Sequence, residues 1–65
     1  MDESVRKAIN EQLTVSVDVA ARAFGIGRNA AYDAVKVGQI PSIRIGGRIV
    51  VPTAKLREML GIKAV

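Results

Sequence analysis

Five polar or amphipathic side chains of one short segment have the chemistry needed to read a nucleic acid. A helical period over residues 28–37 places them on one face: Arg28, Asn29, Tyr32, Asp33 and Lys36. An arginine matches the edge of guanine and an asparagine that of adenine, whereas a lysine or a tyrosine suits a phosphate. Every amphipathic helix has a solvated face, so this pattern alone is equally that of an ordinary surface helix.

A second basic group lies on a predicted β-hairpin over residues 42–51, where apolar residues alternate around Gly46-Gly47. A two-residue loop would pair Ile45 with Arg48 and mix apolar with charged side chains on each face. A three-residue loop, Gly46 to Arg48, keeps the apolar side chains together, so we predict this register. Its pairs are Ile45 with Ile49, Ile43 with Val51 and Arg44 with Val50.

Helical segments must position these two groups. We expect a helix over residues 4–13 capped by Ser4, a short strand over 13–15, and a helix over 17–24 capped by Ser16. The next helix runs from 28 to about 37. Gly25 ends the helix over 17–24 as a left-handed residue, and Gly38 stops the next helix. Thr53 caps a last helix over 54–60, with Gly61 beyond its end.

The segments over 17–24 and 28–37 form a helix-turn-helix pattern, because two short helices are joined by a three-residue turn that contains glycine. Ala20, Ala21 and Ala31 supply the small residues that a close helix crossing needs. Together with the hairpin, this predicts a small α+β fold: one winged helix-turn-helix domain over residues 1–65, with a two-stranded wing and flanking short helices.

Composition narrows the class of function. The 65 residues include no cysteine and no histidine, so thiol nucleophiles, imidazole bases and the common zinc sites are excluded, and we expect no enzyme, metal or cofactor. Residues 1–24 carry three basic and four acidic side chains (−1), and residues 25–65 carry seven and two (+5). A basic half of a small domain indicates a polyanionic partner. With no apolar run of membrane-spanning length, we expect a cytoplasmic protein.

One competing motif is a glycine-rich fingerprint. Residues 25–30, Gly-Ile-Gly-Arg-Asn-Ala, satisfy the G-x-G-x-x-[GA] pattern of dinucleotide-binding turns. That pattern has meaning only after a strand in a parallel βαβ unit. A helix precedes it here and the chain is too short for such a sheet, so nucleotide binding is not favoured.

The order of motifs from Leu13 to Leu60 resembles the excisionase-type members of the MerR-like winged-helix DNA-binding domains. The matching strings are Ser16-Val17-Asp18, Ala20-Ala21, Phe24-Gly25-Ile26, Arg28 with Tyr32, Gly38-Gln39-Ile40-Pro41, Arg44-Ile45-Gly46-Gly47-Arg48, and Pro52 before Leu56. The resemblance implies a non-catalytic DNA-bending protein that steers an integrase towards prophage excision. Its second helix would lie in the major groove and its wing in the adjacent minor groove.

From the pattern and the resemblance together, the candidate DNA contacts are Ser16, Gly27, Arg28, Asn29, Tyr32, Asp33, Lys36, Arg44, Gly47 and Arg48. Two positions depart from the family pattern. Such domains often have Ser where Gly27 stands, and Arg or Lys where Asp33 stands. An acid there lowers phosphate affinity unless it accepts from cytosine or pairs with Arg28 or Arg44.

Two other functions compete with an excisionase. One is a small phage or plasmid repressor, although Ile62 to Val65 is too short to serve as the dimerisation segment of a typical regulator. The other is a protein-interaction adaptor, which scattered basic side chains would favour over clustered ones. We also predict cooperative self-association on DNA, with residues 4–13 or 62–65 contacting a neighbouring copy or the integrase.

Overall fold

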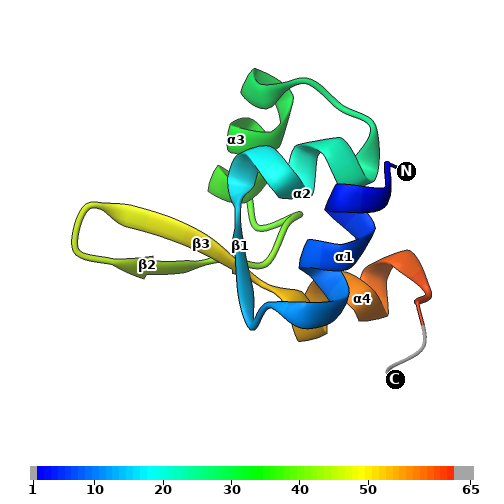
Figure 1. The fold of residues 1–65 in the computed structure, drawn as a ribbon. Coiled ribbons are helices and arrows are strands. Elements are labelled where there is room, and N and C mark those ends of the chain that lie inside the picture. Colours follow the sequence, from blue (N-terminus) through cyan, green and yellow to red (C-terminus); the bar gives the residue numbers. More distant parts are fainter. Residues whose placement is uncertain (1, 63–65) are drawn as a thin grey trace.

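The chain forms four short helices and one antiparallel sheet within residues 2–62, the part that this computed structural model describes (Figure 1). The elements in chain order are α1 (Glu3–Glu11), β1 (Thr14–Ser16), α2 (Val17–Phe24), α3 (Arg28–Lys36), β2 (Ile43–Ile45), β3 (Arg48–Pro52) and α4 (Thr53–Leu60). The sheet order is β1-β3-β2, so β3 is central. This is the predicted small α+β winged helix-turn-helix, with the β2–β3 hairpin (residues 43–52) as its wing.

The bounds of α2 agree with the prediction because local capping determines both ends. The Ser16 hydroxyl accepts a hydrogen bond from the Val19 N–H at 3.2 Å. Gly25 has a φ of 71°, and the Ile26 N–H that follows donates to the Ala21 carbonyl at 3.0 Å. These bonds satisfy backbone groups that the helix itself leaves unpaired, and the left-handed residue turns the chain towards α3.

The predicted start and end of the first helix are wrong. Asp2, not Ser4, caps α1, since its carboxylate accepts from the N–H groups of Ser4 at 2.8 Å and Val5 at 3.4 Å. Hydrogen bonds from the Ser4 hydroxyl and N–H hold the pKa of the Asp2 carboxyl below its usual value. The helix ends at Glu11, and Leu13 lies beyond it with 89% of its surface exposed.

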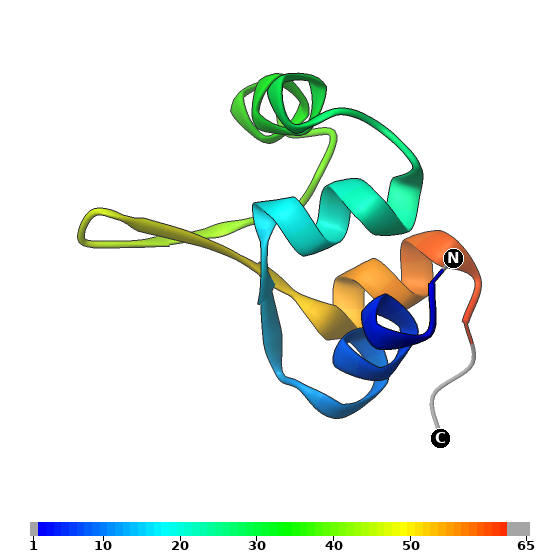
Figure 2. The same ribbon diagram turned by 45° about the horizontal axis from the view of Figure 1, so that its top comes forward.

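The predicted hairpin register is also wrong. The observed pairs are Ile43 with Val50, Arg44 with Ile49 and Ile45 with Arg48, across a two-residue Gly46-Gly47 loop. The prediction assumed that one face of the hairpin is buried. The wing extends away from the helices (Figures 1 and 2), and all of β2 is exposed, so no core selects the apolar register. Turn chemistry decides instead: Gly46 has a φ of 59°, as the first residue of a type II′ turn requires.

The core lies between α1, α2, α4 and the base of the sheet. Figure 2 shows α1 and α4 side by side below α2, and both helices bury side chains completely there, Ile9 and Leu56. The predicted intermolecular role of residues 4–13 is therefore not needed to explain the apolar face of α1. That face is part of the domain's own core.

Thr53 joins the end of α1 to the start of α4. It is 2% exposed, and its hydroxyl reaches the carbonyl oxygens of Gln12 at 2.6 Å and Leu13 at 2.9 Å. The predicted capping role of Thr53 is wrong, because it is the first residue of α4 and makes no side-chain cap bond. Arg57 adds a second link by donating to the Ile9 carbonyl at 2.8 Å.

Candidate nucleic-acid interface

The position of α3 follows from a close crossing with α2. Ala20, Ala21 and Ala31 are at most 4% exposed, so small side chains fill the crossing as predicted. Packing through Ala31 turns the opposite face of α3 to solvent. α3 begins after Gly27, whose carbonyl accepts from the Ala31 N–H at 3.0 Å but which offers no side-chain cap.

A row of side chains spaced four residues apart runs along α3: Arg28, Tyr32 and Lys36. The Arg28 guanidinium carbon lies 5.7 Å from the centre of the Tyr32 ring, a cation–π distance. Such contact orients both groups while leaving guanidinium N–H donors free for an outside acceptor. The orientations of Arg28 and Tyr32 therefore depend on one another.

Tyr32 and Lys36 line a hollow of about 260 Å³ between α3 and the wing. From the wing side, Ser42, Arg44 and Ile49 complete it, with Val35 of α3. The hollow thus has two cationic groups, two hydroxyls and no carboxylate. This combination suits a phosphate group, because charge-assisted hydrogen bonds to phosphate oxygens are among the strongest that a protein surface makes. We refer to it below as the helix–wing hollow.

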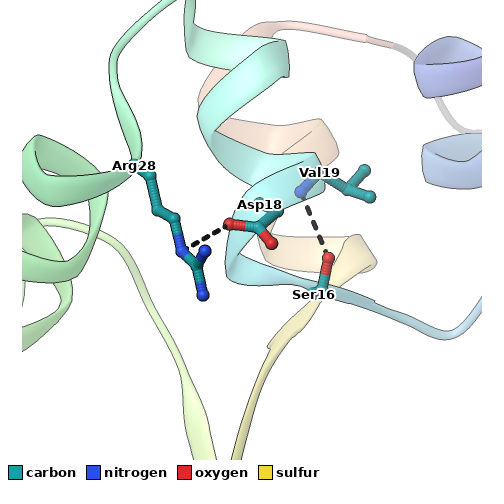
Figure 3. A network of polar contacts seen from close by, with 4 residues as sticks. All are labelled: Ser16, Asp18, Val19 and Arg28. Carbon is teal, nitrogen blue, oxygen red and sulfur yellow. Dashed lines mark hydrogen bonds and ion pairs between the residues drawn. The ribbon is translucent and has the colours of Figure 1, made fainter.

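Arg28 also contacts α2. Its Nε lies 3.2 Å from a carboxylate oxygen of Asp18 (Figure 3). Both side chains are more than half exposed. Asp18 follows Ser16, whose hydroxyl caps the same helix, so the start of α2 faces the start of α3. An exposed pair of this kind contributes little to stability. In the structure it directs the Arg28 guanidinium towards the start of α2.

Asn29 and Asp33 are exposed on α3 next to this row. The alternative that Asp33 pairs with Arg28 or Arg44 is wrong, because Arg28 pairs with Asp18 and no ion pair of Asp33 occurs within residues 2–62. The carboxylate of Asp33 is thus directed to solvent beside Asn29. A base that contacts this face of α3 therefore meets a hydrogen-bond acceptor, the Asp33 carboxylate.

The wing has two chemically different faces as a result of its register. Arg44 and Ile49 face the helix–wing hollow. The other face carries Ile43, Ile45, Arg48 and Val50, which line a shallow groove with Thr14. Arg44 and Arg48 are therefore on opposite faces of one hairpin.

A family comparison agrees with this geometry. Residues 14–61 match the family model described as "Helix-turn-helix domain". The chain belongs to this helix-turn-helix family. The matched range starts at β1 and ends just after α4, so it includes α3 and the wing but not α1. No curated protein and no solved structure matched the chain.

The helix-turn-helix domain is a DNA-binding unit, and only some of its candidate contacts are brought together. Tyr32, Lys36 and Arg44 line the helix–wing hollow, Arg28 is turned towards Asp18 of α2, and Arg48 lies on the other wing face, next to Gly47 in the turn. Ser16 and Gly27 stand at the starts of α2 and α3. No helix of the described chain is both long and apolar enough to cross a membrane.

Sequence reasoning missed two residues of this helix-turn-helix surface. Ser42 lies in the helix–wing hollow, and the signal was its separation of two residues from Arg44, which places both on one face of an extended segment. Asp18 is named in the sequence only within the string Ser16-Val17-Asp18, with no partner on another helix. Its pairing with Arg28 spans ten positions, and nothing local in the sequence indicates it.

Proposed function

We propose that this helix-turn-helix protein is an excisionase: a non-catalytic, sequence-specific DNA-binding and DNA-bending protein that directs an integrase towards prophage excision. The observation that carries the DNA-binding part is the helix–wing hollow, where Tyr32, Lys36 and Arg44 surround a space suited to one backbone phosphate. The excision role rests on the resemblance of residues 13–60 to excisionase-type domains.

In this proposal α3 lies in the major groove. Asn29 and Asp33, on its exposed face, meet base edges, while Arg28 reaches a guanine from the side on which it pairs with Asp18. Lys36 and Arg44 bind the backbone on the wing side of the groove. Phosphate contacts set the position of the domain on the duplex, and base contacts set its sequence preference.

Electrostatics supports the same arrangement. Residues 25–65 sum to +5, and an interface with about four to six phosphates gives a slope of log K against log salt of roughly −4 to −5. Arg44→Ala removes one such contact, so its slope is smaller in magnitude by about 0.9. A salt titration of both proteins on one duplex measures this, and a wild-type slope near zero contradicts DNA binding.

The partners in this proposal are double-stranded DNA of the attachment-site type, an integrase, and further copies of the chain bound cooperatively along the DNA, in the cytoplasm of the host cell. Self-association no longer rests on α1, whose apolar face is buried. The other predicted contact, Ile62 to Val65, falls mostly outside the described residues. Ile62 itself packs against the core.

Footprinting across both prophage attachment junctions, with and without integrase, tests the excision role. We expect protection of tandem sites at one or both junctions and a changed integrase footprint when both proteins are present. Protection at a promoter alone, with straight DNA in a circular-permutation gel, would show a repressor instead. The absence of any footprint on duplex DNA, with retained protein partners, would show an adaptor.

A further inference from the structure

The outer face of the wing is apolar and exposed where the fold gives no reason for it. Ile45 is 69% exposed and Ile43 is 42% exposed, and both lie on the face turned away from the helix–wing hollow. The observed register places Ile45 directly opposite Arg48 at the end of the hairpin. An apolar side chain and a cation therefore stand together at the tip.

The turn between Ile45 and Arg48 has one more glycine than its backbone conformation requires. Gly46 needs glycine because its φ is positive, but Gly47 has no positive φ, and a Cβ there would meet nothing within 4 Å. An alanine at position 47 would fit the isolated domain. A partner that approaches the turn too closely to admit a Cβ at position 47 would explain the second glycine.

The charge of the wing identifies the class of that partner. Residues 42–52 contain two arginines and no acidic residue, and the arginines stand on opposite faces. A thin, cationic tip with one apolar side chain matches the minor groove, which is only about 6 Å wide and carries negative potential from both strands. A flat protein surface would impose no such limit on thickness.

We infer that Ile45 is an apolar wedge: the wing tip enters the minor groove through Gly46-Gly47, and Ile45 opens the stack at a base step while Arg48 binds in the groove. Apolar wedges of this kind kink a duplex by about 20–90°. The inference rests on the proposed DNA binding and gives the bending a physical origin. Pyrimidine–purine steps, which unstack most easily, are the expected position.

Ile43 provides a matched control. It has the same side chain on the same strand and face, but two residues farther from the tip, a separation of about 7 Å. The minor groove is about 7.5 Å deep, so Ile43 stays near its rim when Ile45 is inside. Both side chains are exposed, and circular dichroism should show that Ile45→Ala and Ile43→Ala remain folded.

The test uses a short duplex selected from a random pool by the wild-type protein, with 2-aminopurine replacing successive adenines. Wild type and Ile43→Ala should raise the fluorescence at one step and bend the duplex. Ile45→Ala should lose both effects while its affinity falls by less than about tenfold. Gly47→Ala should stay folded and bind more weakly at A·T-rich flanks, where the groove is narrow.

Three results would overturn the inference in distinguishable ways. Unstacking and bending that persist in Ile45→Ala would remove the wedge and leave DNA binding intact. Sedimentation showing that Ile45→Ala loses self-association, with its bending unchanged, would make this face a protein contact. Failure of the wild-type protein to select any duplex would refute the proposed DNA binding, and the wedge with it.

Discussion

Replacing Ile9 by alanine tests whether α1 belongs to the domain or serves as a surface for partners. Ile9 is 0% exposed, and its carbonyl accepts the hydrogen bond of Arg57 at 2.8 Å. Ile9→Ala removes about three methylene-sized groups, worth about 2.4 kcal/mol in transfer free energy, and leaves a cavity. The total cost should be about 2–5 kcal/mol.

That loss is large for this chain, because domains have about 0.05–0.15 kcal/mol of stability per residue, or about 3–10 kcal/mol for 65 residues. The melting temperature of Ile9→Ala should fall by at least about 10 °C in a thermal scan followed by circular dichroism. DNA binding at 25 °C should weaken only as the folded fraction falls, since no residue of α1 lines the helix–wing hollow.

Leu13→Ala is the control, because Leu13 follows the same helix but is 89% exposed. Its stability should change by less than about 0.5 kcal/mol. The reasoning is refuted if Ile9→Ala melts like wild type while cooperative DNA binding or integrase contact is lost. That outcome would make α1 an intermolecular surface.

Three further substitutions test local features. Gly27→Ser should stabilise the chain by about 0.5–1.5 kcal/mol in urea unfolding, since a serine fits the extended backbone and caps α3; an unchanged midpoint would contradict this. Asp18→Asn should bind random duplex more tightly but select its site less strictly, because Arg28 loses its fixed direction; unaltered preference in a selection experiment would exclude this role. Asp2→Asn should reduce the fall in melting temperature below pH 3.8. The lowered pKa of Asp2 means that its stabilising effect is complete above that pH and disappears as the pH falls through its folded value; identical pH profiles would argue against it.

Local sequence signals predicted the helix-turn-helix closely. Ser16 and Gly25 define α2 because capping and a left-handed residue act within a few positions. The turn and the alanine crossing follow from the same short range, so the orientation of α3 and its exposed face could be anticipated. The capping of α1 shows the limit of this reasoning, since two neighbouring residues, Asp2 and Ser4, were both competent caps.

Features that depend on distant parts of the chain were not predictable. The predicted register, which keeps the apolar side chains of the hairpin on one face, is favoured only where a core covers that face. The sequence does not show that the wing extends away from the core. Thr53 was interpreted as a cap because serine and threonine favour helix starts, yet its partners are about forty positions away. The pairing of Arg28 with Asp18 likewise exists only once two helices are packed together.

The central strand β3 runs without a loop into α4, and this continuity has a mechanical consequence. Val51 is completely buried opposite Val15, whereas Arg48, three residues away, stands about 10 Å out in solvent. A sideways force on the tip therefore acts on a lever arm whose pivot is inside the core. Work done on the wing is transmitted to the start of α4, where Thr53 is bonded to the end of α1, so two helices outside the wing resist its deflection.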